Sequence, residues 1–505
     1  MAALPRTGRA TARRGNTAKG ISFSALAGVV SLVAGIVLLP VVLSAVGPAA
    51  YGTWLFLLAV ASFLFFLDLG VGTAIVHFLS RSRSGDQDAD PDTVASTAHA
   101  WALAACLVAI GIYILVAINY AAEGLQSVSS SDFVVMVVAG IAILSTMAVR
   151  PMSSVLFGTG FLHVERTYQV VGVLVRVVGT LAACWIDGSI VGVVLAETAA
   201  LMIPPIIALW KVRRLHLVQI HWRHVSKREL KRMMGYSLGA FSVSMVGASI
   251  LQFGTLVIGV LGNANQVAYF NAAFRIYASV RQIIGWLTDP FRSVLSRLYV
   301  NDSRRASVVL YDLLFVAFLV STLGCLLLLV TLPVVLDVWL GGTVPTEEVS
   351  AAASALLAGL ILNALHIPLI PASDAAGSPG AFLPHQIFWL VSYAGLAFVL
   401  FPALGIIGVA LAMTAPLPIL EFAYLLTAAR TVKLDFKVWF TRVTRPTLPI
   451  LLLGLAAASS TNLFTEPAWV IFVGVLFAVA SLAVLFFTRV SWSYRSVLGS
   501  LKTEA

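Results

Sequence analysis

The side chains with the clearest capacity for chemistry in this chain are arginines placed inside apolar stretches. Arg150, Arg176, Arg275 and Arg281 each stand within a run long enough to cross a bilayer. An ionisable group at such depth is costly and normally faces a water-filled cavity or a partner of opposite charge. Because a planar guanidinium matches the oxygens of a phosphate, we expect a cationic cavity that binds a phosphorylated head group.

A fifth arginine extends this set along one expected helix, residues 266–298. Arg281, Thr288 and Arg292 recur at intervals of seven and eleven residues, which returns them to one helix face within about 20°. The spacing predicts a polar stripe on one side of this helix, with Arg292 as an additional binding residue.

The same arginines also have a purely structural interpretation. Each could pair with a buried carboxylate and hold two helices together, and the candidate partners are Glu197, Asp289 and Glu421. The sequence leaves both interpretations open for any single arginine.

Four polar residues are candidate gate or coupling residues: Asp68, His77, Glu197 and Asp289. Asp68 ends the second apolar run beside Gly70, where helix packing or a cytoplasmic gate accounts for it at least as well as an ion site. Histidine titrates near neutral pH, which would let His77 carry a proton. A polar contact at a helix interface is the simpler interpretation of His77.

Other chemistry finds no support in the sequence. Cys106, Cys184 and Cys325 each lie in an apolar run without CxxC spacing, so neither a disulfide nor a zinc site is expected. No HExxH, GxSxG or GxxxxGK[ST] motif occurs, which argues against an enzyme and against an ATP-driven pump. We expect no cofactor and no metal. A membrane polysaccharide polymerase or glycosyltransferase is the remaining enzyme alternative.

Long apolar segments must position these side chains. Hydrophobic residues make up 60% of the chain and charged residues 11%, too few to give a water-soluble domain of this size a polar surface. Runs of this length cross a hydrocarbon core of about 30 Å. We expect an all-α polytopic membrane protein with about fourteen transmembrane helices, near 21–46, 51–79, 95–120, 132–158, 163–186, 190–210, 233–260, 266–298, 306–337, 349–372, 379–400, 404–429, 446–463 and 467–488.

Basic residues are distributed unevenly along this plan. Of the 32 Lys and Arg residues, about 28 fall on the side of the membrane that carries both termini, and none falls in the loops on the other side. The positive-inside rule makes the first side cytoplasmic. The net charge of +10 therefore orients helices and contacts membrane lipids rather than nucleic acid. Tyr51, Trp54 and Trp101 are expected in aromatic belts at the interfaces.

Two partial repeats divide the chain. VLSAVGPAAYGTW at 42–54 and VIGVLGNANQVAYFN at 257–271 each close a hairpin, and each precedes an acid that ends the next helix, Asp68 or Asp289. Parallel repeats of this kind indicate two bundles with a substrate held between them. We expect a basic tail at 1–20, an N-lobe of six helices at 21–210, a basic linker at 211–232, a C-lobe of six helices at 233–429, two further helices at 430–488 and a cytoplasmic tail at 489–505.

Two short motifs carry a resemblance to a known family. A Gly-x-x-x-Tyr-Gly turn at 47–52 follows the first helix, and Asp-Leu-Gly at 68–70 ends the second. Together with the fourteen-helix plan and the basic loop after six helices, the sequence resembles the polysaccharide and O-antigen repeat-unit flippases of the multidrug/oligosaccharidyl-lipid/polysaccharide (MOP) exporter superfamily. The resemblance covers essentially the whole chain.

The resemblance implies two pseudo-symmetric six-helix lobes, with two C-terminal helices added, in the bacterial cytoplasmic (inner) membrane. It implies movement of an undecaprenyl-pyrophosphate-linked oligosaccharide between leaflets by alternating access, for surface polysaccharide biosynthesis. Polysaccharide polymerase and assembly proteins are candidate partners. The alternative is an ion-coupled exporter of small molecules from the multidrug (MATE) branch, whose often cationic ligands several buried arginines would repel.

Overall fold

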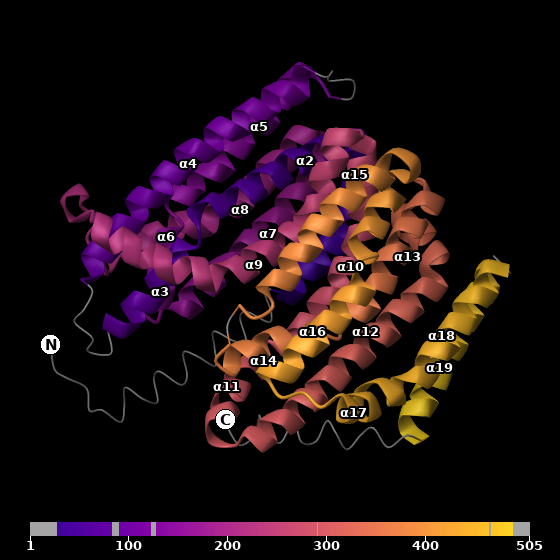
Figure 1. Cartoon of the computed structure of the whole chain (residues 1–505). Helices are drawn as coiled ribbons and strands as arrows, with labels where there is room; N and C mark the ends of the chain where they lie inside the picture. Colours follow the sequence, from indigo (N-terminus) through magenta and orange to yellow (C-terminus); the bar gives the residue numbers. More distant parts are fainter. Residues whose placement is uncertain are drawn as a thin grey trace. The chain divides into compact units, whose positions relative to one another are not determined.

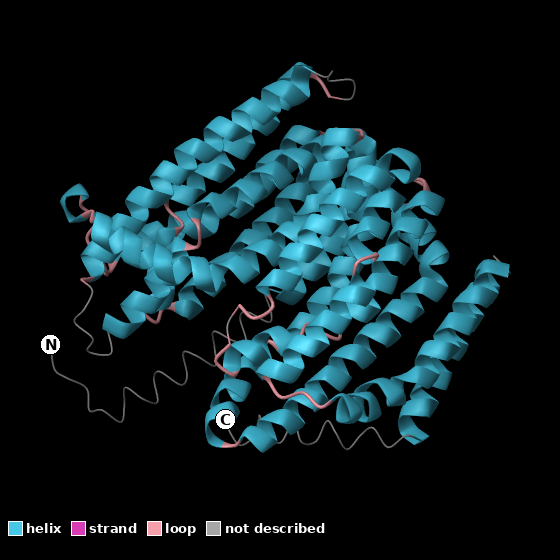
Figure 2. Ribbon diagram, viewed as in Figure 1, coloured by secondary structure: helices cyan, strands magenta, loops and turns pink. Residues whose placement is uncertain are grey.

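A computed structural model of the chain describes residues 28–82, 90–122, 128–289, 291–378, 380–463 and 466–487 (Figure 1). The expected basic tail at 1–20 and the expected tail at 489–505 lie outside the described residues. Every regular element in the described part of the chain is helical (Figure 2). Helices satisfy their own backbone hydrogen bonds, which is the requirement that a hydrocarbon environment places on a chain this apolar.

The chain divides into two compact units, and α9 contributes to both. The first unit holds Met1–Met245 and Asn263–Ala268. Its helices are Gly28–Val46, α2 (Pro48–Leu64), η1 (Phe65–Asp68), α3 (Val71–Ser82), α4 (Pro91–Ala122), α5 (Ser130–Ser145), η2 (Thr146–Ala148), α6 (Pro151–Gly158), α7 (Leu162–Ile186), α8 (Ile190–Arg214), η3 (Trp222–His224) and the first part of α9 (Lys227–Leu261).

The second unit holds Val246–Gly262 and Tyr269–Ala505. After the second part of α9, its helices are most of α10 (Ala264–Thr288), α11 (Phe291–Asn301), α12 (Ser303–Leu340), α13 (Thr346–Asn363), α14 (Leu369–Ala375), α15 (Leu383–Thr414), α16 (Leu417–Thr431), α17 (Phe436–Trp439), the π-helical turn η4 (Phe440–Thr444), α18 (Arg445–Leu463) and α19 (Pro467–Phe487). Within this unit α18 and α19 pack on α12. The lobe boundaries expected from the sequence stay a prediction.

Eleven helical stretches among the described residues are long and apolar enough to cross a membrane, against about fourteen expected. The difference arises in three places. The segments α10 and α13 fall outside the eleven because they carry polar and charged residues, and the helices expected near 379–400 and 404–429 form one stretch, Leu383–Thr431. The all-helical class is confirmed, and the number fourteen is not.

Five expected helices are each broken in two, and three of the breaks lie beside candidate site residues. The run 51–79 divides at Leu69 and Gly70, whose φ values of 52° and 71° place both in the left-handed region. The run 132–158 divides before Pro151, which cannot donate a backbone hydrogen bond. The run 266–298 divides between Thr288 and Phe291. The residue before a proline disfavours helical conformation, and Asp289 holds that position in the sequence.

Small residues bring α7 and α8 into close contact. A Cβ on Gly179 would lie 2.8 Å from the Ala196 side chain, and one on Gly192 would lie 2.6 Å from Ala183. Gly172 faces the carbonyl of Ala200, which has no intrahelical donor because Pro204 lies four residues later. Small residues at helix contacts let backbones approach closely in membranes. This seam fixes the relative position of the side chains between its glycines.

Candidate functional site

A cavity of about 990 Å³ lies within the first unit. Four of the residues expected to act at a site line it: Asp68, Arg150, Arg176 and Glu197. They come from the η1 turn, from the residue before α6, and from the facing sides of α7 and α8. The cavity therefore brings together two guanidinium groups and two carboxylates rather than positive charge alone.

Arg176 is neutralised by Glu197 across the α7–α8 seam. Its Nη2 and Nε atoms donate to Glu197 Oε1 at 2.7 and 3.1 Å. Trp54 Nε1 donates to the second carboxylate oxygen at 2.6 Å. The Glu197 side chain is 5% exposed and the Arg176 side chain 27% exposed. For Arg176 the structural interpretation, pairing with Glu197, is the one that the structure contains.

Trp54 is fully buried, and Tyr51, one helical turn earlier on α2, is buried beside Arg176. The expectation that both residues lie in an interfacial belt is therefore wrong. Their position near the end of an apolar run favoured that interpretation, because sequence position does not reveal which face of α2 meets α7 and α8. In the structure Trp54 is a hydrogen-bond donor that fixes the Glu197 carboxylate.

Asp68 and Arg150 form the second pair of opposite charges at this cavity. Asp68 Oδ1 accepts a 2.7 Å hydrogen bond from the Gly70 backbone N–H, and its carbonyl accepts one from Trp101 Nε1 at 3.1 Å. The Arg150 guanidinium lies over the Phe65 ring, 4.8 Å from its centre, and it interacts electrostatically with Asp68. Asp68 thus closes the left-handed turn between η1 and α3, a structural task that accounts for its type.

His77 lies outside this cavity. It stacks on Tyr236 with a ring-centre distance of 4.1 Å, and both residues line a separate open hollow of about 420 Å³ with Arg81. The arrangement is the polar helix contact that the sequence offered as the simpler interpretation.

Arg281 has different surroundings, in the second unit. Its Nη1 donates to Asn363 Oδ1 at 3.1 Å, and it interacts electrostatically with Tyr277 and Tyr424. Among the described residues, Arg281 has no carboxylate within ion-pair distance. The Arg281 side chain is half-buried, and the groups that contact its guanidinium are uncharged: the Asn363 amide and two tyrosines.

The other expected arginines of this unit belong to two different helices. Arg275 is half-buried on α10. Arg292 belongs to α11 and forms an exposed ion pair with Asp374 of α14 at 2.5 Å. Asp289 is exposed in the break between α10 and α11.

The predicted polar stripe of Arg281, Thr288 and Arg292 is wrong, because Arg281 and Thr288 belong to α10 and Arg292 to α11. Thr288 is buried and donates to the carbonyl of Ile284.

Glu421 pairs with a histidine and, within the described part of the chain, with no arginine, contrary to the interpretation offered from the sequence. Its Oε1 lies 2.6 Å from Nδ1 of His366, and both side chains are almost fully buried. Tyr424 stacks parallel to the imidazole at 4.1 Å. Sequence reasoning missed His366, since a lone histidine in an apolar run gives no signal of its partner.

A sequence model of the family described as "Polysaccharide biosynthesis protein" matches residues 17–288, more than half of the chain. The chain belongs to this family. The assignment agrees with the resemblance carried by the turn at 47–52 and by Asp-Leu-Gly at 68–70. No curated protein matches the chain in a sequence search.

Solved structures of MOP superfamily transporters share the fold of this polysaccharide biosynthesis family member. The lipid II flippase MurJ, in an inward closed conformation, is 15% identical with a TM-score of 0.70, covering 93% of this chain and 100% of MurJ. An inward-facing MATE family multidrug resistance transporter is 16% identical with a TM-score of 0.64, covering 80% and 94%. A MOP superfamily transporter from Pyrococcus furiosus is 18% identical with a TM-score of 0.51, covering 83% and 94%. The chain is a multi-pass membrane protein of the MOP fold.

In this family member the Gly-x-x-x-Tyr-Gly turn has a steric reason. A Cβ on Gly52 would lie 1.8 Å from the backbone oxygen of Ala264, so only glycine allows the start of α10 to approach α2. Gly47 has a φ of 82°, which glycine adopts without strain. The turn residues therefore serve backbone geometry rather than binding.

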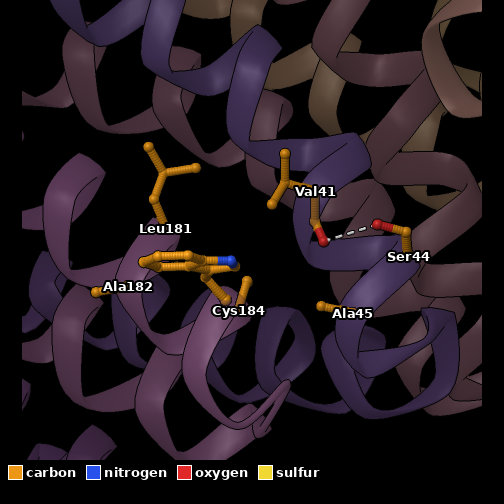
Figure 3. Close-up of a pocket in the computed structure, with 7 residues that line it drawn as sticks. Val41, Ser44, Ala45, Leu181, Ala182 and Cys184 are labelled. Atoms are coloured by element: carbon orange, nitrogen blue, oxygen red, sulfur yellow. Dashed lines mark hydrogen bonds between the residues drawn. The ribbon is translucent and has the colours of Figure 1, made fainter.

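A third hollow, of about 450 Å³, separates the first helix from α7 (Figure 3). Val41, Ala45, Leu181 and Cys184 point into it, and the Ser44 hydroxyl turns back to donate to the Val41 carbonyl at 3.0 Å. Nothing in this lining carries a charge that would bind an anion. The charged cavity and the surroundings of Arg281 are therefore the candidate sites.

Proposed function

We propose that the protein is a flippase for an undecaprenyl-pyrophosphate-linked oligosaccharide. It moves this lipid from the cytoplasmic to the outer leaflet of the bacterial cytoplasmic membrane, for surface polysaccharide assembly, with both termini in the cytoplasm. Membership of a polysaccharide biosynthesis family and the fold shared with the flippase MurJ support the proposal. Polymerase and assembly proteins are the partners that would consume the product.

One observation carries the choice of an anionic lipid head group: the charge of Arg281 is held by an amide and not by a carboxylate. A guanidinium without an acidic partner is costly in a membrane protein unless an anion or water reaches it. Its planar fork matches pyrophosphate oxygens in a site of low dielectric. Arg281 is therefore the principal head-group residue, with Arg275 on the same helix as a secondary contact, and Arg150 stays a separate candidate within the first unit.

Arg176 has another task in this proposal. Because Glu197 neutralises it, Arg176 contributes little net attraction for an anion while the pair is closed. The pair holds α7 against α8, so the first unit can move as one body during alternating access. Energy comes from an ion gradient, the membrane potential or consumption of the product, since the sequence has no ATP-binding loop.

The experiment replaces Arg281 with alanine in a strain that depends on this gene for surface polysaccharide. We expect Arg281→Ala to abolish the polymer and to accumulate lipid-linked oligosaccharide in the cytoplasmic leaflet, with normal protein levels in the membrane. The matched control is Arg304→Ala, which removes an exposed arginine at the start of α12. Wild-type polymer with Arg281→Ala would reject the head-group role.

The alternative of a small-molecule exporter rests on one observation, the Asp68 and Glu197 carboxylates at the 990 Å³ cavity. A carboxylate there would attract a cationic ligand. Drug sensitivity of the deletion strain, with unchanged polysaccharide, would favour this alternative. Two contacts argue against a cation-binding role for these carboxylates. Glu197 is already neutralised by Arg176, and Asp68 accepts the hydrogen bond that closes the turn before α3.

A further inference from the structure

A buried polar cluster in the second unit plays no part in the head-group contact. It surrounds the pair formed by His366, in the turn after α13, and Glu421 of α16. These side chains are 2% and 5% exposed, and Nδ1 lies 2.6 Å from Oε1. The second carboxylate oxygen, Oε2, is buried and has no hydrogen-bond partner among the described residues. A full negative charge with one oxygen unsatisfied is among the most costly groups a membrane protein can bury.

The imidazole of His366 packs between two aromatic rings, Tyr424 and Trp389. Tyr424 lies parallel to it at 4.1 Å and Trp389 meets it edge-on at 6.1 Å. Trp389 is itself fixed by a 2.8 Å hydrogen bond to the Met413 carbonyl. An aromatic face over a cationic ring is stabilising. The pair can therefore exist with the carboxylate and a neutral imidazole, or with one more proton and no net charge.

The pair is connected to Arg281 through one residue. Asn363 accepts from Arg281 Nη1 through Oδ1, and its backbone carbonyl accepts the His366 N–H at 3.2 Å. A proton added to the pair would raise the positive potential around the Arg281 guanidinium. Anion binding at Arg281 would in turn favour uptake of that proton, because coupling between two sites is reciprocal.

Other ionisable groups of the second unit have partners of their own. Asp374 of α14 is held by Arg292 in an exposed ion pair. Cys325 of α12 contacts the Ser321 hydroxyl. Among the described residues, His385 of α15 interacts electrostatically with His366, and Tyr424 of α16 interacts with both Glu421 and Arg281.

We propose that the His366–Glu421 pair is a proton-binding site whose occupancy is linked to anion binding at Arg281. The proton is exchanged with water and no covalent bond other than N–H or O–H is made or broken. Among the described residues, Oε2 of Glu421 and Nδ2 of Asn363 are buried polar atoms without a hydrogen-bond partner, and ordered water would bridge them to the pair. The linkage rests on the proposed function, whereas the proton site itself does not.

The first test needs no substrate. Infrared difference spectra of the purified full-length protein, taken between mildly acidic and mildly alkaline pH, should contain a carboxylate or imidazole band from the pair. The band should vanish in Glu421→Gln and in His366→Asn and persist in Asp312→Asn, which removes another buried carboxylate of the same unit. A spectrum unchanged by both pair variants would overturn the proton site. Two variants are used so that one failure to fold leaves the test intact.

The second test measures binding of undecaprenyl pyrophosphate in detergent at the same two pH values. We expect affinity to be about tenfold higher at the acidic value in the wild type, the effect of one unit charge near the bound anion. Glu421→Gln should keep only the dependence that arises from the ligand's own ionisation, and Asp312→Asn should behave as the wild type. Equal pH dependence in wild type and Glu421→Gln would overturn the linkage. Binding that Arg281→Ala leaves intact would instead reject the proposed head-group site and leave the spectroscopic result standing.

Discussion

Two arginines inside apolar helices of this protein differ in what neutralises them. Arg176 donates twice to Glu197, and the carboxylate is completed by Trp54. Arg281 donates to an amide. The first arrangement neutralises both charges within the protein, which suits an ion pair that holds two helices together. The second leaves a positive charge that an anionic ligand can use, and this contrast separates a structural from a binding role.

If the Arg176–Glu197 ion pair holds α7 and α8 together, removing one partner should lower the stability of the protein. Glu197→Gln leaves Arg176 without an acid, and breaking a buried pair in this way costs about 3 kcal/mol, the low end of the usual range, because Arg176 keeps 27% exposure. The melting temperature of the purified protein should therefore fall. The double variant Arg176→Gln with Glu197→Gln should lose less than the sum of the single variants. Strict additivity would contradict direct coupling of the two charges.

Sequence alone identified the charged residues and offered Glu197 as one of three candidate acids, but it did not assign an acid to a particular arginine. Arg176, Glu197 and Arg281 were found because ionisable groups stand out in apolar stretches. The choice between Glu197 and another acid depends on which helices pack together, and the partners lie on different helices. Trp54 and His366 were missed because each is compatible with an apolar run and becomes informative only through the carboxylate that it contacts.

Breaks within helices are the main feature at the scale of elements. The break between α2 and α3 was expected only in part, because Asp-Leu-Gly at 68–70 was assigned to a helix end while the expected helix range, 51–79, continued past it. The break within α15 was expected as a loop between two helices, yet the stretch continues through it with a single non-helical residue. Gly405 has φ 54° and ψ −136°. Boundary positions of this kind depend on how neighbouring helices pack, which local sequence does not encode.

The conformation of Gly405 predicts a large difference between two glycines of the same helix. Gly405→Ala should cost about 1–3 kcal/mol, because residues with a Cβ rarely adopt this backbone conformation. The control is Gly395→Ala, where a Cβ meets nothing within 4 Å and alanine favours the helix by about 0.5–1 kcal/mol. Thermal unfolding in detergent should rank Gly395→Ala at or above wild type and Gly405→Ala below it. The reverse order would mean that the break does not require glycine.

At the scale of the whole molecule, sidedness follows from loop charge rather than from helix packing. About 28 of the 32 basic residues lie in the segments that the expected topology places in the cytoplasm. The opposite orientation would put all of these basic segments outside, against the positive-inside rule. The direction of lipid transport depends on this assignment, because the proposed substrate is made on the cytoplasmic side. The helical class followed directly from composition, whereas the number of spans did not, since polar residues keep α10 and α13 outside the eleven long apolar stretches of the described residues.

Single cysteines test the orientation in a background in which Cys106, Cys184 and Cys325 are replaced by serine. Lys227→Cys, exposed at the start of α9, should react with a membrane-impermeant maleimide only after the cells are permeabilised. Glu347→Cys, exposed in the first turn of α13, should react in intact cells. Both variants must support surface polysaccharide for the labelling to report the working protein. Labelling of Lys227→Cys in intact cells would place the basic linker outside and reverse the proposed direction of transport.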